Sequence, residues 1–350
     1  MTSSRTARLL LLAVLGSTAL AACSQGGSTG ASGSSGAPAA AKTKKAGDIT
    51  VGYAGPTLTN AFFVGLEKGV KDGAAKEGFK LKETNANGDA SQQVNDAVNL
   101  LNQGVDVLIL TPIDSNGITP AVQQANAKGV PVFTLDRGSS GGTITSFVET
   151  NNVSAGKQAA AYLGDQLTKR YGSAKGNVVD LQGLIGTTAA KSREAGFQAG
   201  LKSLPGLKVV ANQEGGFDQE KSLNAMTNIL QAQPQIDALF GANDDNTVGA
   251  LRAIDGSKRY KPLGDKGHII IIGIDGTAQA LDAIRAGKQD ATISQNPIKM
   301  AERSLGFVKD LMVDGKGVPA HDYWPTILIN QKNIDSPAVK QYGLWSSEVK

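Results

Sequence analysis

The sequence has few of the residues that form covalent cross-links or metal sites. It contains one cysteine, Cys23, so no internal disulfide can form. Its two histidines, His268 and His321, are far apart and match no metal-ligand spacing. Neither a GxGxxG nor a Walker-type sequence is present, and the D-x-[DN]-x-[DN]-G spacing of a calcium-binding loop is also missing. We therefore expect no metal and no cofactor.

The chain also lacks a large excess of positive charge. Its formal net charge is +4, and 35 basic residues less Arg5 and Arg8 of the leader leave 33 against 31 acidic residues, or +2. Proteins that bind nucleic acid concentrate lysine and arginine on one face. The sequence therefore predicts no nucleic-acid partner.

The apolar run near the N-terminus is too short to span a bilayer. It covers 14 residues, Leu9 to Ala22, whereas a membrane-spanning helix needs about 20. Two arginines precede the run and small residues end it, a pattern typical of a secretory signal peptide. We assign residues 1–22 to that leader.

Cys23 lies directly after the leader, at the end of the sequence LAAC, which resembles a bacterial lipobox. The alternative is an accidental cysteine in an ordinary signal peptide. Residues 24–46 are rich in glycine, serine and alanine, a composition that cannot bury a core. We predict that Cys23 is lipidated, that residues 23–47 form a flexible tether with solvated lysines at its far end, and that the protein is extracytoplasmic, attached to the bacterial cell membrane through the lipid alone.

From Asp48 onward, short apolar strands alternate with amphipathic helices. Strands are predicted at Ile49–Tyr53, 80–84, Val105–Leu110, Val130–Leu135 and, in the second half, at 177–182, 207–213, 238–242, 268–274 and 291–294. Continuous apolar strands separated by helices indicate parallel sheets covered on both faces. Because the pattern restarts after Asn152, we predict an α/β fold with two doubly wound parallel-sheet lobes.

Polar residues collect where these strands end. In open parallel sheets, ligands bind beyond the carboxyl ends of the strands. Each such residue could instead cap a helix or form a turn, but the set comes from both halves of the chain. The candidates are Asn60, Asp136, Arg137, Arg193, Asn243, Asp275 and Gln295.

The composition of this set favours a neutral, hydroxyl-rich ligand. Asp136 and Asp275 offset Arg137 and Arg193, whereas an anion would need surplus cations or a phosphate cradle. Carboxylate, amide and guanidinium groups suit the adjacent hydroxyls of a sugar or polyol.

Aromatic side chains near the set suit the apolar faces of a sugar ring. Phe62 and Phe63 are neighbours, so in a helix they point about 100° apart. We expect one to pack inward and the other to offer its face to the cleft, with Phe217 on the opposite side. The alternative is that both pack into the core.

Six ordered motifs carry a family resemblance that covers nearly all of residues 48–330. TLTNAFF, PVFTLDR, LQGLIGTTAAKSREAGF, FGAND, GIDGT and ATISQNP resemble, in order, the motifs of periplasmic D-ribose-binding proteins of ABC importers. The resemblance implies two lobes joined by three crossovers near Asn151, Asn296 and Trp324. The N-terminal lobe would comprise 48–150 plus 296–325, and the C-terminal lobe 151–295 plus 326–350.

The resemblance also implies a function. The seven polar candidates fall on the family's sugar hydrogen-bonding positions, and Phe62, Phe63 and Phe217 fall on its ring-packing positions. The protein would close on a neutral monosaccharide by a hinge motion, with D-ribose favoured, and deliver it as a monomer to a permease driven by an ATPase. Pro56 departs from the small hydroxyl residue found in ribose-binding relatives, so fructose, xylose, allose or a polyol stay open.

Three other classes of protein could use a similar sugar-binding module. A sugar-responsive repressor needs an N-terminal helix-turn-helix, where this chain has a leader and tether. In a glycosidase, Asp136 and Asp275 would act as acid and base, but we expect their arginine and amide neighbours to keep both ionised. No Ser-His or Cys-His partnership can be assembled either, so we predict that the protein is not an enzyme. A binding protein for sugar sensing without transport remains an alternative.

Overall fold

The computed structural model describes residues 43–348. The predicted signal peptide, Cys23 and most of the predicted tether lie outside this range. Within it, none of the helices has the length and apolar character needed to cross a membrane.

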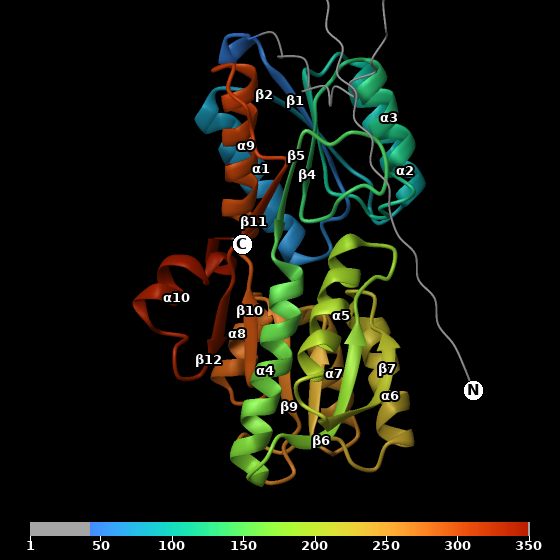
Figure 1. The fold of residues 1–350 in the computed structure, drawn as a ribbon, viewed down its shortest axis with the longest axis vertical. Helices are drawn as coiled ribbons and strands as arrows, with labels where there is room; N and C mark the ends of the chain where they lie inside the picture. Colours follow the sequence, from blue (N-terminus) through green and yellow to red (C-terminus); the bar gives the residue numbers. More distant parts are fainter. Residues whose placement is uncertain (1–42, 349–350) are drawn as a thin grey trace, which may run out of the picture. The chain divides into compact units, whose positions relative to one another are not determined.

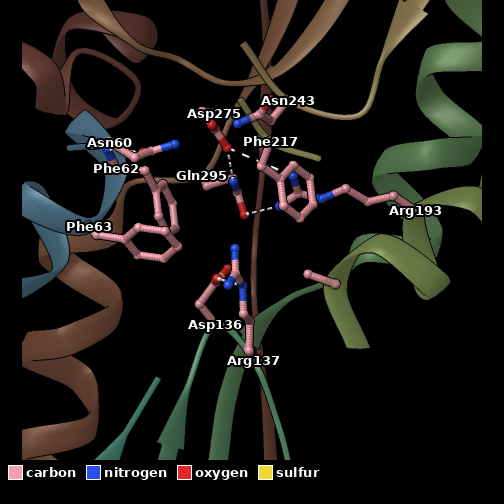
Figure 2. A pocket seen from close by; sticks show the side chains of 11 residues that line it. Asn60, Phe62, Phe63, Asp136, Arg137, Arg193, Phe217, Asn243, Asp275 and Gln295 are labelled. Carbon is pink, nitrogen blue, oxygen red and sulfur yellow. Dashed lines mark hydrogen bonds and ion pairs between the residues drawn. The ribbon is translucent and has the colours of Figure 1, made fainter. Parts of the chain in front are cut away.

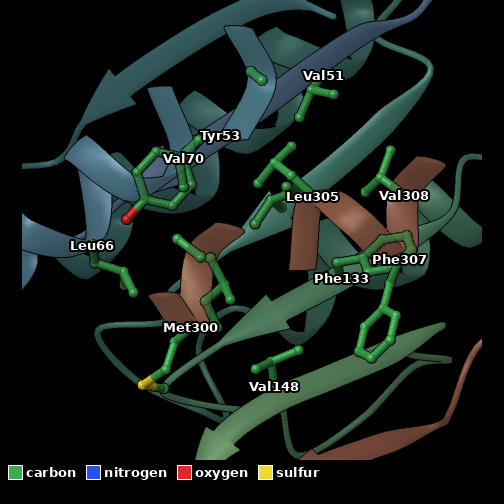
Figure 3. Close-up of a cluster of buried hydrophobic side chains, with 14 of the residues drawn as sticks. Val51, Tyr53, Leu66, Val70, Phe133, Val148, Met300, Leu305, Phe307 and Val308 are labelled. Carbon is green, nitrogen blue, oxygen red and sulfur yellow. The ribbon is translucent and has the colours of Figure 1, made fainter. Parts of the chain in front are cut away.

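The first sheet is parallel throughout and has the strand order β11-β5-β4-β3-β1-β2. Its strands are β1 (Thr50–Gly55), β2 (Lys80–Asn85), β3 (Val107–Leu110), β4 (Val132–Leu135), β5 (Ser146–Thr150) and β11 (His321–Trp324). Helices α1 (Ala61–Glu77), α2 (Ala90–Asn102), α3 (Thr119–Ala127) and α9 (Pro297–Met312) belong to this lobe (Figure 1). One core packs between the sheet and helices α1 and α9 (Figure 3), and a second lies under α2 and α3.

The second sheet has the order β12-β10-β9-β8-β6-β7 and is parallel except for β12, which pairs antiparallel with β10. Its strands are β6 (Lys175–Gln182), β7 (Gly206–Glu214), β8 (Ala238–Gly241), β9 (Ile270–Asp275), β10 (Ala291–Ser294) and β12 (Ile327–Asn330). The helices of this lobe are α4 (Asn152–Tyr171), α5 (Thr188–Leu201), α6 (Gln219–Ala232), α7 (Asp244–Gly256), α8 (Ala278–Arg285) and α10 (Pro337–Tyr342). The prediction of two doubly wound parallel-sheet lobes is confirmed.

Three short segments connect the lobes: residue 151 between β5 and α4, residues 295–296 between β10 and α9, and residues 325–326 between β11 and β12. At the second connection, Asn296 adopts φ +56° and caps α9, whose first residue is Pro297. Because the chain enters and leaves each lobe at these places, the carboxyl ends of both sets of parallel strands face the same gap.

Glycines allow the closest helix contacts in each lobe. A Cβ added to Gly69 of α1 would lie 2.3 Å from the carbonyl oxygen of Ile298 in α9. A Cβ on Gly156 of α4 would lie 2.1 Å from the carbonyl oxygen of Arg193 in α5, and one on Gly196 would lie 2.2 Å from that of Val153. The α4–α5 contact therefore fixes the backbone of Arg193, a predicted ligand-binding residue.

Both ends of the described chain differ from the expected boundaries. The main-chain N–H of Lys44 donates to Met312 O over 2.8 Å, and its side chain pairs with Asp106. The short helix η1 (Ala46–Asp48) follows, so the folded part begins before residue 48. At the other end, Trp345 packs in the core of the first lobe, although residues 326–350 were expected in the second. In each case a main-chain bond or a buried ring attaches the segment to the first lobe.

Candidate functional site

A cavity lies between the carboxyl ends of the strands of the two lobes (Figure 2). Its volume is about 20 Å³, room for about one water molecule, so the lining side chains lie close together in this arrangement of the lobes. All ten residues predicted from the sequence line it, together with Ala189. The lining comprises Asn60, Phe62, Phe63, Asp136, Arg137, Ala189, Arg193, Phe217, Asn243, Asp275 and Gln295.

On the first-lobe side, Asp136 and Arg137 follow β4 directly. Asp136 adopts φ +60°, a left-handed conformation that is costly for a residue with a side chain and is often found at functional sites. Arg137 Nε lies 3.6 Å from Asp136 Oδ2, too far for a hydrogen bond. Within residues 43–348, both Asp136 Oδ1 and Arg137 Nε are buried without a hydrogen-bond partner. Buried polar atoms are normally satisfied, so a ligand is the natural partner for these two.

On the second-lobe side, Arg193 is held by three hydrogen bonds. Nε donates to Asn152 Oδ1 over 2.8 Å, one Nη to Ala242 O over 2.7 Å, and the other Nη to Gln295 Oε1 over 3.0 Å. Gln295 in turn donates to Asp275 Oδ1, which lies 3.9 Å from Arg193 Nη1. The dashed lines in Figure 2 follow part of this chain of contacts.

Two asparagines line the cavity and also cap helices. Asn243 Oδ1 accepts from Asn246 N at the start of α7, and Asn60 Oδ1 accepts from Phe62 N at the start of α1. Asn60 Nδ2 also donates to Asp245 Oδ2 over 2.6 Å, which joins the two lobes. The helix-capping role that the sequence left open is therefore real for both residues, alongside their place in the cavity.

Phe62 and Phe63 do not divide their roles as expected. Both belong to the first-lobe core, with 4% and 5% of their surface exposed, and both also line the cavity. Their rings meet edge-to-face at 5.6 Å, so the edge of one supports the other. Both rings can contact the core and the cavity because Phe62 and Phe63 lie in the first turn of α1, which is between the two.

Phe217 lies on the opposite side, between the two cavity arginines. The guanidinium carbons of Arg137 and Arg193 are each 5.4 Å from its ring centroid. Phe217 adopts φ +60°, and a Cβ on Gly183 would lie 2.2 Å from its ring. A strained backbone and a glycine are therefore both needed to place this ring.

Burial dominates the electrostatics of the carboxyl groups. It raises the pKa of Asp136 despite the opposing charges of Arg137 and Arg193, and it raises the pKa of Asp275 well above the ordinary value despite Arg193. Burial also lowers the pKa of Arg137. Burial therefore opposes the arginine and amide contacts that were expected to keep both carboxylates ionised, and it is the larger influence on their pKa values.

The lobes also touch beside the cavity, next to the lining residues Arg137 and Ala189. Gly138 N donates to Thr188 Oγ1 over 3.0 Å, and Ser115 N donates to Gly186 O over 3.2 Å. With the Asn60–Asp245 bond, these contacts hold the lobes in a closed arrangement.

Sequence reasoning missed three residues of the site. Ala189 has no polar signal of its own. Asn152 follows β5, so the rule that picked the other strand-end residues would have found it had that strand been recognised. Asp245 lies two residues after Asn243, but its bond to Asn60 spans 185 positions and leaves no local pattern.

Comparisons with known proteins identify relatives of this two-lobed chain. A family model described as a periplasmic binding protein domain matches residues 51–317. The chain is 38% identical over 287 residues to the ribose import binding protein of Bacillus subtilis (strain 168), covering 81% of this chain and 88% of the relative. It is 30% identical over 278 residues to a xylitol-binding protein of Mycolicibacterium smegmatis, covering 79% and 76%.

Solved structures agree with the sequence comparisons. A protein from Mycobacterium smegmatis, in complex with β-D-fucofuranose, superposes with a TM-score of 0.76 at 27% identity, covering 86% of this chain and 97% of that one. The matched region of the family model contains all the residues that line the cavity. The chain therefore belongs to the periplasmic binding protein family, the membership that its ordered motifs predicted.

Proposed function

We propose that this protein captures a neutral monosaccharide between its lobes, with D-ribose the first choice, and delivers it to an ABC importer. One observation carries the proposal: Asp136 and Arg137 present buried polar atoms without partners into a cavity whose two carboxyl groups match its two arginines in number. A neutral polyhydroxy ligand would satisfy these atoms without adding a net charge to the buried space.

The cavity suits both surfaces of a sugar. Its polar groups offer donors and acceptors for adjacent hydroxyls, and the rings of Phe62, Phe63 and Phe217 offer apolar surface for the C–H faces. An anionic sugar would meet Asp136 and Asp275 as well as the two arginines. This balance favours a neutral sugar over a sugar phosphate.

The choice of ribose rests on the named relatives. The B. subtilis protein with a ribose import role is 38% identical to this chain, and the xylitol-binding relative is 30% identical. Fructose, xylose, allose or a polyol are the alternatives in the same class. Sugar sensing without transport is the alternative role.

Binding would act on the hinge. The closed lobes touch through Asn60 and Asp245, and a sugar bound to both halves of the cavity would stabilise that arrangement over an open one. The sugar would be released unchanged to a permease and its ATPase, with no chemical step, and a single chain would suffice. We place Asn60, Phe62, Phe63, Asp136, Arg137, Arg193, Phe217, Asn243, Asp275 and Gln295 in the ligand-binding set.

We further propose that Cys23 carries a lipid that anchors the protein on the outer side of the bacterial cell membrane. The support is the LAAC sequence at the end of a short apolar run. Labelling cells with a fatty-acid analogue tests it. Retention of label and of membrane attachment in Cys23→Ser would refute the anchor.

Calorimetry of the full-length protein with pentoses, hexoses, polyols and sugar phosphates tests the main proposal. We expect a neutral sugar to bind, with ribose tightest. A sugar phosphate that binds more tightly than every neutral sugar would overturn the charge argument. A tighter xylitol or fructose would keep the class and change the ligand.

A further inference from the structure

Residues 342–346, here called the tail segment, pass between the cores of the two lobes. The helix before it, α10, packs in the second lobe, where Val339 is buried beside Ile284 and Ile329. Leu344 still packs against that cluster, but Trp345, the next residue, lies in the core of the first lobe. The segment lies outside residues 51–317, the region that the family model matches.

Side chains next to the second connection hold the tail segment in place. Ser294 Oγ donates to Gly343 O over 2.9 Å, and Asn296 Nδ2 donates to Tyr342 O over 2.8 Å. A Cβ on Gly343 would lie 2.8 Å from the Cδ1 methyl of Ile329, so a larger residue here would have to displace that side chain. The segment is therefore fixed to the backbone between β10 and α9.

Trp345 is buried between the two lobes, with 1% of its surface exposed. Its ring meets Phe62 edge-to-face, with centroids 6.2 Å apart and planes at 89°. A Cβ on Gly65 of α1 would lie 3.0 Å from the ring, so the glycine makes room for it. On its other side, the indole Nε1 donates to the main-chain oxygen of Asp275 over 2.9 Å.

The Asp275 main chain needs such support. Asp275 adopts φ +141°, a conformation that side chains rarely take, and Gly276 follows at φ +83°. Its carbonyl oxygen accepts one bond from Gln295 N over 3.1 Å and a second from Trp345. Strained backbone persists only where its surroundings hold it. The direction of the Asp275 carboxyl group depends on that backbone.

We propose that Trp345 is a positioning residue of the ligand site: it does not line the cavity, but its N–H holds the Asp275 backbone while its ring rests on Phe62 of the other lobe. Ligand affinity then depends on a residue outside the matched family region. The inference rests on the proposed function, since it assumes that Asp275 binds the sugar.

Trp345→Phe tests the proposal because it keeps a ring against Phe62 and removes the N–H. Loss of one hydrogen bond that supports a ligand-binding group should weaken ribose binding about 2- to 12-fold in calorimetry. The matched control is Trp324→Phe, the same substitution in the other tryptophan, which ends β11 and does not line the cavity. We expect the control to bind within about twofold of the parent.

A double-mutant cycle separates positioning from general destabilisation. In an Asp275→Ala background the carboxyl group is gone, so Trp345→Phe should cause little further loss of affinity. The proposal is overturned if Trp345→Phe binds like the parent, or if its loss is undiminished in that background.

Hydrogen exchange on the ligand-free protein keeps this result distinct from failure of the proposed function. The amides of Gly276 and Thr277, which both donate to Asp244 Oδ2, should exchange faster in Trp345→Phe than in the parent or in Trp324→Phe. If the parent binds no neutral sugar, the proposed function fails, and the exchange rates alone decide whether Trp345 positions Asp275. Unchanged exchange in that case overturns the inference.

Discussion

On the second-lobe side of the cavity the polar side chains bond to one another, whereas on the first-lobe side two buried polar atoms have no partner. Arg193 alone makes three hydrogen bonds, to Asn152, Ala242 and Gln295. Asp136 Oδ1 and Arg137 Nε make none within residues 43–348. One half is thus organised by the protein alone, and under the proposed function the other would be completed by the ligand.

This difference separates two kinds of binding residue. A residue of the organised half supports both the lobe and the ligand, so its loss should lower stability and affinity together. A residue of the unsatisfied half contributes little to the ligand-free protein, so its loss should lower affinity with a small change in stability.

The largest effect is expected for Arg193→Ala. It removes three hydrogen bonds and leaves Asp275 buried without its nearest cation, and truncating one member of a buried charge pair costs about 2–5 kcal/mol, or roughly 30- to 5,000-fold in affinity. The melting temperature of the ligand-free protein should fall as well. Calorimetry and thermal unfolding measure the two effects.

Arg259→Ala is the matched control for this variant. Arg259 also bonds three main-chain carbonyls, those of Leu230, Gln233 and Pro234, but it does not line the cavity. It should lower the melting temperature and leave sugar affinity unchanged. Equal affinity losses in the two variants would show that Arg193 acts through the fold alone.

A smaller effect is expected for Asp136→Asn. A hydrogen bond to a charged group contributes about 1.5–3 kcal/mol, so affinity should fall roughly 10- to 150-fold. The melting temperature should change much less than in Arg193→Ala, because Asp136 Oδ1 has no hydrogen-bond partner among residues 43–348 to lose.

Asp180→Asn provides the comparison. Asp180 in β6 is also buried with Oδ1 unpartnered among the described residues, and burial raises its pKa well above the ordinary value, but it lies outside the cavity lining. The Asp180→Asn variant should bind sugar with the same affinity as the parent. The contrast between the two halves fails if Asp136→Asn destabilises the ligand-free protein as much as Arg193→Ala does.

A still smaller effect is expected for Phe217→Leu, which keeps apolar volume and removes the aromatic face. Loss of a cation–π contact costs about 0.5–2 kcal/mol, so affinity should fall roughly 2- to 30-fold. Phe307→Leu removes a similar pair, with Arg303 lying 4.6 Å from the ring centroid, outside the cavity lining. That control should affect thermal unfolding only. Equal calorimetric affinities for the parent and Phe217→Leu would remove the ring from the ligand-binding set.

The smallest effect on sugar affinity is expected at Glu149, at the edge of the organised half, where a substitution should instead change how stability depends on pH. Glu149 Oε2 accepts from Asn152 Nδ2, and burial raises the pKa of Glu149 to about 7. An unfolded glutamate ionises near pH 4.3, so between about pH 4 and 7 the folded state holds more protons and the free energy of unfolding falls as pH rises. Glu149→Gln cannot ionise, so its stability relative to the parent should rise between about pH 4 and 7, even though it loses the negative charge beside His321, whose Nε2 lies 2.8 Å from Glu149 Oε1. Melting curves that stay parallel over this range would contradict the assignment.

The sequence predicts those structural elements whose pattern lies within a few neighbouring residues. Strands such as β3 and β9 are continuous apolar runs, and the polar residues that follow them were found because strand ends meet at one edge of a sheet. β5, β11 and β12 were not predicted. Their places are set by pairing with strands far away in sequence, as in the register of His321 with Phe147.

The site residues likewise divide into those found from local sequence and those that depend on distant contacts. Asp136 and Asp275 follow from their positions at strand ends, and Arg193 from its place in the helix that follows β6. Trp345 reaches Asp275 across 70 positions, and nothing near it in sequence indicates that contact. The upward shifts in the pKa of Asp136 and Asp275 were also not predicted, because burial depends on the whole fold and not on neighbouring residues.

The two tryptophans of the chain both lie near the junction of its lobes: Trp324 ends β11 beside the third connection, and Trp345 is the buried residue of the tail segment. Indole emission changes with the polarity and packing around the ring. The intrinsic fluorescence of these two tryptophans should therefore report movement of the lobes. Rapid mixing with sugar can follow closure in real time, without a dye attached to either lobe.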